Sequence, residues 1–137
     1  MYFKQDTGPA RKQRRAFVIW ATVVLGCVIA LLTLMPVSVP KSLPGDDKLY
    51  HMLAFFGLTL PCAVIYPRAL VRVVLAAVLY GALIELIQPT VGRSREMADL
   101  IADTTGVFLG AALGWPLHHA FMAYLRKKAT VRSDTQR

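Results

Sequence analysis

Acidic, basic and amide side chains interrupt the apolar parts of this 137-residue chain at three places along the sequence. Each group stands in or beside an apolar run long enough to cross a bilayer, where an unpaired charge has a large desolvation cost. Such groups therefore need a compensating partner or serve a function. The set consists of Asp47, Lys48, His51, Glu85, Gln88, Arg93, Asp99 and Asp103.

These side-chain types allow three kinds of role. Inward-facing acids together with His51 could perform general acid–base hydrolysis of a lipid-linked substrate. A cluster of mixed charge at the headgroup level could instead bind the polar part of an amphiphile, or pin the ends of several helices together. The sequence shows no phosphate loop, nucleophile elbow or dinucleotide fingerprint, and no activated nucleophile. It therefore assigns no catalytic residue and favours a protein that is not an enzyme.

Histidines and cysteines give little support for a metal site. One histidine with several carboxylates suits a harder ion better than structural zinc, and no HxxxH or CxxC spacing is present. His118 and His119 stand about 30 Å from the polar set, given the rise of a helix per residue. Cys27 and Cys62 fall in the middle of apolar runs, where they are interpreted as small packing residues. We therefore predict neither a metal nor a cofactor.

Four apolar runs position the polar set, in a chain whose residues are 55% hydrophobic. The runs cover residues 16–35, 49–66, 69–87 and 98–117, and the last continues apolar to residue 125. The first run has no charge and, at about 1.5 Å per residue, spans the hydrocarbon core of about 30 Å. We predict an all-α polytopic membrane protein, with four transmembrane helices in an antiparallel bundle formed by residues 16–125.

Lysine and arginine are distributed unequally between the two sides of this bundle. Twelve belong to the segments before residue 16 and after residue 125 and to the second connection, and four belong to the first and third connections. The positive-inside rule therefore predicts that both basic termini, residues 1–15 and 126–137, are cytoplasmic. They are interpreted as topology determinants and contacts to anionic lipid, and not as a nucleic-acid footprint. The first run is longer than a signal-peptide core and lacks a small-residue cleavage site, so we predict that it is retained.

Proline, glycine and capping residues mark the three connections. Pro36, Pro40 and Pro44 predict an extended first connection, which leads to an aspartate cap at residue 46 or 47. The second connection is only a few residues long, which predicts a tight hairpin between helices two and three. Helix three is predicted to stop before Pro89, and Ser94 is the predicted cap of helix four.

One face of the predicted fourth helix carries two acids and three glycines. At about 100° per residue, these side chains fall within a sector of about 80°. They are Asp99, Asp103, Gly106, Gly110 and Gly114. Glycines spaced by four let a neighbouring helix approach closely, so we expect this face to turn toward the bundle, either within one chain or across a dimer. The oligomeric state is left open.

The polar groups of helices two, three and four converge on one membrane boundary in this topology. Helices two and four start on the extracytoplasmic side, and helix three ends there. Arg93 lies in the short connection between helices three and four, so its planar guanidinium is predicted to bridge Glu85 and Asp99. A carboxylate buried at this boundary needs such a cationic partner or a bound proton.

The order of these motifs resembles the VanZ-like family of small bacterial membrane proteins, named for an accessory protein of a glycopeptide-resistance cluster. The resemblance covers about residues 46–114. Its three blocks read Asp47-Lys48-x-x-His51-x-x-x-Phe55-Phe56, then Glu85-x-x-Gln88, then Gly92-Arg93-x-x-x-x-x-Asp99-x-x-x-Asp103-Thr104-x-Gly106-x-x-x-Gly110. The family commonly has Asn where this chain has Asp103, so the site here carries one more negative charge or one shared proton.

This resemblance implies a multi-pass protein of the bacterial inner or plasma membrane, with teicoplanin-type resistance for some members, and supplies no reaction. We expect an envelope protein whose extracytoplasmic polar site binds a lipoglycopeptide or a lipid-linked cell-wall precursor, with membrane lipids as its other partners and no nucleic acid. The alternatives are a membrane-embedded hydrolase of a lipid-linked substrate and a small exporter. Helix one has no ionisable group near mid-membrane, as coupled export would need.

The predicted topology is testable by cysteine labelling in intact cells. A cysteine in place of Gln5 or Ser133 should resist a membrane-impermeant reagent, whereas a cysteine in place of Ser42 should react, because the basic termini are held in the cytoplasm. The opposite labelling pattern would place the whole polar set on the other side of the membrane.

Overall fold

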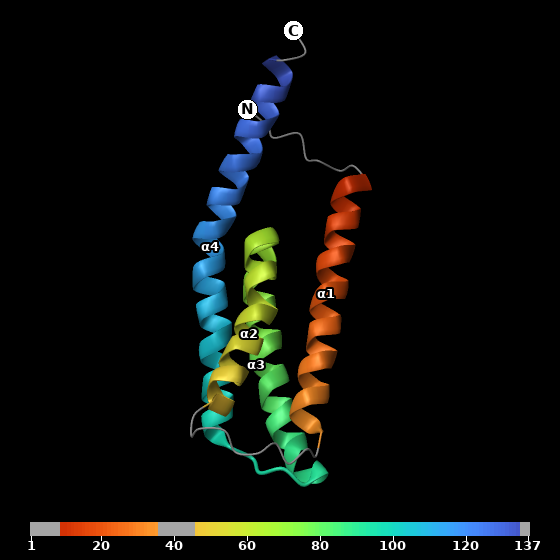
Figure 1. The fold of residues 1–137 in the computed structure, drawn as a ribbon, viewed down its shortest axis with the longest axis vertical. Coiled ribbons are helices and arrows are strands. Elements are labelled where there is room, and N and C mark those ends of the chain that lie inside the picture. Colours follow the sequence, from red (N-terminus) through yellow and green to blue (C-terminus); the bar gives the residue numbers. More distant parts are fainter. Residues whose placement is uncertain (1–8, 36–45, 135–137) are drawn as a thin grey trace.

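The computed structural model describes residues 9–35 and 46–134. The predicted extended connection with its three prolines lies outside the described residues, as do residues 1–8 and 135–137. The described chain is helical, without a strand in these two ranges, and Figure 1 shows its arrangement. Its elements are α1 (Pro9–Leu34), α2 (Asp46–Ile65), η1 (Pro67–Ala69), α3 (Leu70–Ile87), η2 (Gln88–Val91) and α4 (Met97–Asp134).

All four long helices of the described chain are apolar enough to cross a membrane. The spans are Ala16–Leu34, Asp47–Ile65, Pro67–Val91 and Met97–Leu125. They agree with the predicted runs within a few residues, which confirms the all-α, four-span prediction. α4 is longer than its apolar run and continues as helix to Asp134, through most of the basic segment that follows the bundle. Pro61 and Pro116 both lie inside continuous helices.

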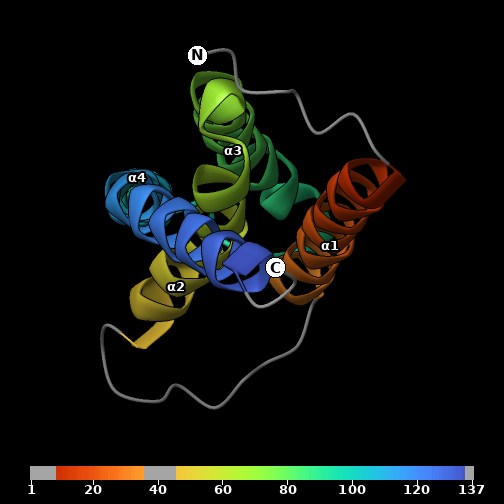
Figure 2. The same ribbon diagram turned by 90° about the horizontal axis from the view of Figure 1, so that it is seen from above.

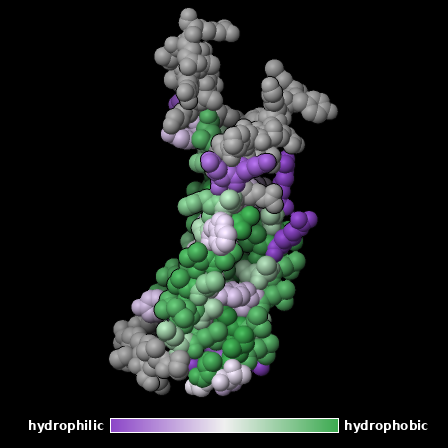
Figure 3. Space-filling model, turned by 90° about the vertical axis from the view of Figure 1, so that its right-hand side faces the viewer, coloured by the Kyte–Doolittle hydropathy of each residue, from purple (hydrophilic) through white to green (hydrophobic). Residues whose placement is uncertain are grey.

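Consecutive helices run in opposite directions, so α2 and α4 are parallel to each other (Figure 1). α1 and α3 end at one end of the bundle, where α2 and α4 begin, and we call this the site end. Pro9 and Asp134, the outer ends of α1 and α4, lie at the opposite end. On the face drawn in Figure 3, hydrophobic residues cover the middle of the molecule, and hydrophilic residues lie toward both ends.

Short helical turns make the two described connections. Between α2 and α3, the amide of Ala69 donates to the carbonyl oxygen of Tyr66 (2.9 Å), which closes the predicted tight hairpin. After α3, the chain passes through η2 to Gly92, whose φ of 80° is left-handed and therefore suits glycine. The amide of Arg93 then donates to the carbonyl oxygen of Gln88 (3.1 Å) and completes the turn toward α4.

The glycine face of α4 packs against α2 within the same chain. A Cβ atom at Gly110 would lie 2.9 Å from the carbonyl oxygen of Phe56, and one at Gly106 would overlap the carbonyl group of Met52. At Gly114 an added Cβ would overlap the side chain of Ala63. Hydrogen is therefore the only side chain that this separation of the two helices allows, and the glycine face forms an intramolecular seam.

The apolar core lies between α2, α3 and α4, with Phe55, Ile84 and Val107 almost fully buried. α1 packs against it at one side, through Ile29, and Figure 1 shows α1 and α4 on opposite sides of α2 and α3, whereas Figure 2 shows the C-terminal part of α4 reaching across toward α1 in that view. Only 11% of the span of α1 is buried inside the molecule, compared with 33% for α2. α1 is therefore the most loosely packed of the four helices.

Two glycine substitutions, one in the packing seam and one facing open space, should differ in their effect on stability. Gly110→Leu should lower the free energy of unfolding by about 1–3 kcal/mol or more, because the new side chain must push α2 away from α4. Gly26→Leu should cost much less, since an added Cβ there meets nothing within 4 Å. Thermal unfolding of both variants in detergent measures the difference, and equal melting temperatures would show that the seam does not hold the bundle.

Candidate functional site

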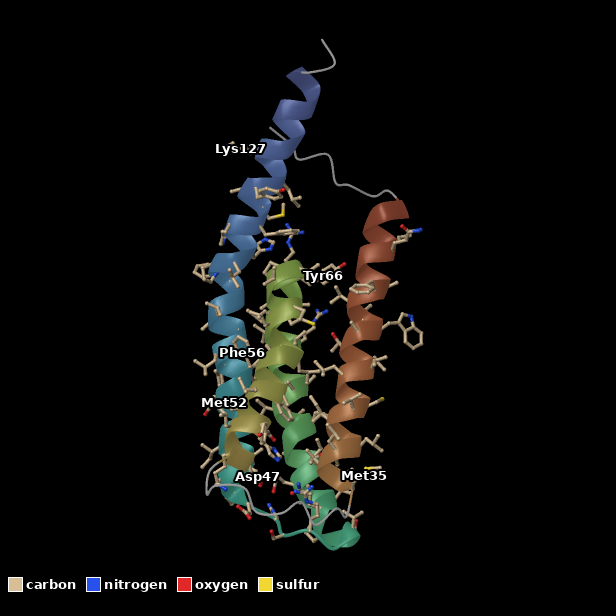
Figure 4. The ribbon with its side chains drawn as sticks, in the orientation of Figure 1. Met35, Asp47, Met52, Phe56, Tyr66 and Lys127 are labelled. Carbon is tan, nitrogen blue, oxygen red and sulfur yellow. The ribbon has the colours of Figure 1, made fainter. Side chains whose placement is uncertain are left out.

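Five buried polar side chains lie together at the site end, where the first turns of α2 and α4 meet the end of α3. Figure 4 shows this cluster of polar tips beside the labelled Asp47, at the same end as Met35. The exposed fraction of each of the five is 6% or less. They are His51 from α2, Glu85 from the end of α3, Gln88 from η2, and Asp99 and Asp103 from α4. Polar groups buried so completely usually have hydrogen-bond partners nearby.

The imidazole of His51 lies between the two carboxylates of α4. Its Nδ1 is 3.0 Å from Oδ1 of Asp103, and its Nε2 is 3.9 Å from Oδ2 of Asp99. Asp99 and Asp103 are one helical turn apart, so they face the imidazole from the same side of α4. When Nδ1 carries a proton it donates to Asp103, and an imidazolium would form an ion pair with both acids. His51 therefore links α2 to two successive turns of α4, through Asp99 and Asp103.

Lys48 forms the outer layer of the site. Its Nζ lies 3.2 Å from Oε2 of Glu96 and 3.6 Å from Oδ1 of Asp99. The side chains of Lys48 and Glu96 are 41% and 45% exposed, whereas that of Asp99 is 6% exposed. The Lys48–Glu96 pair thus covers the buried aspartate at the boundary. Glu96 was absent from the sequence prediction, although its position directly before α4 is where an acid favours a helix start.

Glu85 accepts hydrogen bonds from two directions at the end of α3. Its Oε2 accepts the backbone N–H of Glu96 at 3.0 Å. In the amide orientation that satisfies both residues, the side-chain nitrogen of Gln88 donates to both carboxylate oxygens, at 3.1 and 3.2 Å. The carboxylate therefore stands at the start of α4, where the helix dipole favours a negative charge.

The prediction that Ser94 caps α4 was wrong. The hydroxyl of Ser94 donates to Oε1 of Glu96, at 3.4 Å, and not to a backbone amide of the helix. Glu85 provides the capping acceptor from α3. The spacing along one helix could not reveal this contact, because it depends on how α3 and α4 meet in space.

The predicted bridge from Arg93 to Glu85 and Asp99 was also wrong. Among the described residues the guanidinium has no carboxylate partner, and its Nη1 donates to the carbonyl oxygen of Leu32, 3.4 Å away at the end of α1. Lys48 is the cation beside Asp99. The left-handed turn at Gly92 sets the direction in which the chain leaves η2, and it sends Arg93 toward α1. Asp47 is exposed and lies at the edge of the site.

Two buried carboxylate oxygens of the site accept no hydrogen bond from the part of the chain that the structure describes: Oδ1 of Asp99 and Oδ2 of Asp103. The latter faces Gly81 on α3, where an added Cβ would lie only 3.0 Å from it. Gly81 therefore makes room for the second carboxylate. Within residues 9–35 and 46–134, no three His, Cys, Asp or Glu side chains are grouped to hold a metal ion. The open acceptors suit a hydrogen-bond donor.

The segment that contains this site is also the segment that identifies the family. The sequence model of the VanZ/LLP1 family matches residues 46–119, more than half of the chain. The chain belongs to the VanZ/LLP1 family. Comparisons of the chain with curated proteins and with solved structures found no match.

The VanZ/LLP1 segment begins at the first residue of α2 and holds α2, α3 and the apolar part of α4. It includes all eight polar residues predicted for the site and the three glycines of the seam. α1 and its contacts lie outside it. This protein is therefore a VanZ-family membrane protein with four membrane-capable helices in its described residues, three of which fall in the matched segment.

Glu85 should be a stabilising residue as well as a site residue. Glu85→Ala leaves the amide of Glu96 and the side chain of Gln88 buried without their acceptor, which should lower the free energy of unfolding by about 1–3 kcal/mol. Asp47→Ala removes an exposed carboxylate and should change it by less than about 0.5 kcal/mol. Thermal unfolding of both variants in one detergent decides this, and a Glu85→Ala variant as stable as Asp47→Ala would refute the capping role.

Proposed function

We propose that the polar site binds the polar part of an extracytoplasmic amphiphile, either a lipoglycopeptide or a lipid-linked cell-wall precursor, and that the protein thereby contributes to teicoplanin-type glycopeptide resistance. The observation that carries this proposal is the pair of buried acceptors, Oδ1 of Asp99 and Oδ2 of Asp103. Oδ1 of Asp99 faces Lys48 only at 3.6 Å, beyond hydrogen-bond distance, and buried acceptors without a hydrogen bond are costly, so a ligand that supplies a donor is favoured there. The chain belongs to the VanZ/LLP1 family, and the resemblance described above implies teicoplanin-type resistance for some members, which agrees with such a ligand.

The layers of the site suit reversible binding from the water boundary. The outer Lys48–Glu96 pair is exposed, and exposed ion pairs are weak enough to open. Once it opens, Lys48 can meet a phosphate or carboxylate of the ligand, and Asp99 can accept from a hydroxyl, amide or ammonium group. The inner contacts of His51 and Glu85 hold the three helices in place, so the outer groups are positioned before the ligand arrives.

The position of the site at the end of the spans supports an amphiphile as the ligand more than a fully soluble molecule. Asp99 lies near the start of the span Met97–Leu125, so a bound polar group would sit at the headgroup level. The remainder of an amphiphile could then lie along the apolar helices. Lipoglycopeptides and lipid-linked wall precursors both join a hydrocarbon chain to sugars and peptides that carry many hydrogen-bond donors.

A second function is favoured by the pairing of His51 with Asp103. A carboxylate that orients an imidazole is the arrangement used by general bases, and hydrolysis of a lipid-linked substrate is the reaction it would serve. In this site the second nitrogen of His51 faces Asp99, so the imidazole meets a carboxylate on both sides. Incubation of the purified protein with wall-precursor lipids, followed by mass spectrometry, separates the two functions: turnover that depends on His51 favours the hydrolase.

Drug susceptibility of cells tests the binding function. In a bacterium that the wild type protects, Asp99→Asn and Lys48→Gln should lose most of the protection against an acylated glycopeptide, because they alter the groups that meet the ligand. Protection should be smaller against a glycopeptide without an acyl chain. Arg95→Ala is the matched control and should behave as wild type, because Arg95 is an exposed basic residue in the connection between η2 and α4.

Equal membrane levels of all variants must be shown by immunoblotting. If Asp99→Asn and Lys48→Gln protect as well as Arg95→Ala does, the site does not act in resistance. If the wild type itself changes no susceptibility, the resistance part of the proposal fails, whatever the site binds.

A further inference from the structure

A cavity of about 550 Å³ separates α1 from α2 and α3, on the side of the bundle away from α4. Small residues form half of its lining, beside larger side chains such as Val23, Leu58 and Val73; they are Gly26, Cys27 and Ala30 on α1, and Ala76 and Ala77 on α3. Each of these positions would narrow the cavity if it carried a larger side chain. An added Cβ at Gly26 would meet nothing within 4 Å, which shows how open the wall is.

Two hydrogen bonds to backbone oxygens hold α1 beside this cavity without filling it. The hydroxyl of Tyr80, on α3, donates to the carbonyl oxygen of Gly26. Arg93, after η2, donates through Nη1 to the carbonyl oxygen of Leu32. α1 is thus fixed in position although little of its surface is buried. These two contacts therefore keep α1 next to α3, so that the cavity between the helices is maintained.

The cavity lies at the depth of the hydrocarbon core and ends near a cation. On α1 it extends from Thr22 to Ala30, about 12 Å of helix, inside the span Ala16–Leu34. Arg93 reaches α1 at Leu32, two residues beyond that end of the cavity. Its guanidinium has no carboxylate partner among the described residues, and the planar fork of arginine matches a phosphate.

We propose that this cavity holds one acyl chain of a phosphate-bearing membrane lipid, whose headgroup phosphate lies against Arg93. The lining is almost entirely apolar, and the cation stands where the polar end of such a lipid would emerge. This lipid site goes beyond the proposed function, since its cation is Arg93, which contacts α1 and none of the five buried side chains of the polar site.

Lipid retention by the full-length protein tests the proposal. The protein is purified in detergent, mixed with phosphatidylglycerol or with diacylglycerol of the same acyl chains, and examined by native mass spectrometry. The wild type should retain one phosphatidylglycerol per chain, at least about fivefold more than diacylglycerol. Gly26→Leu fills the cavity and should reduce retention at least about fivefold. Gly57→Leu is the matched control, because its added Cβ also meets nothing within 4 Å but lies outside the cavity lining.

Arg93→Ala should lower phosphatidylglycerol retention to the level of diacylglycerol, whereas Lys48→Gln should leave it unchanged and so keep this site distinct from the polar site. If Gly26→Leu is unstable in a thermal melt, Ala76→Leu on the opposite wall replaces it, since that residue is already exposed. The acyl-chain site would be overturned if the cavity-filling variant retained as much lipid as the control Gly57→Leu. The cavity-filling variant is Gly26→Leu, or Ala76→Leu if the first is unstable. Unchanged lipid preference in Arg93→Ala would overturn the phosphate contact.

Discussion

The close contact between α2 and α4 is the constraint on which the rest of this structure depends. Gly106 and Gly110 let the backbone of α2 approach until no side chain larger than hydrogen would fit between the helices. Both helices begin at the same end of the bundle, so this contact also sets their register. In that register His51 stands between Asp99 and Asp103. Apolar packing in the middle of the membrane therefore determines which charges meet at its boundary.

The charges in turn limit which arrangements of the helices are possible. A buried carboxylate that loses its partner leaves an uncompensated charge, and this costs far more than a well-made pair contributes. Asp103 needs His51 from α2, and Glu85 needs the amide of Glu96 at the start of α4. A rotation of α4 about its axis would break both contacts and also turn the glycines away from α2. Packing and polar pairing thus select the same structure.

Hydropathy and helical geometry were sufficient to predict the four spans, the tight second connection and the inward turn of the glycine face. Each depends on local sequence or on one helix. The partners within the site could not be predicted in the same way, because they depend on how separate helices meet. Arg93 lies midway in sequence between Glu85 and Asp99, yet a single left-handed residue at Gly92 directs it to α1. Glu96 was overlooked because its role comes from the approach of α2 and α3.

Direct binding to the purified protein is the measurement closest to the central claim that Asp99 sits in a ligand site formed by α2, α3 and α4. A fluorescent lipoglycopeptide can be titrated against the wild type and Asp99→Asn in lipid nanodiscs, with Asp47→Asn as the control at an exposed aspartate. We expect saturable binding to the wild type and to Asp47→Asn, and an affinity about tenfold lower for Asp99→Asn, the loss of roughly one charge-assisted hydrogen bond. Binding that does not saturate, or equal affinity for all three proteins, would contradict it.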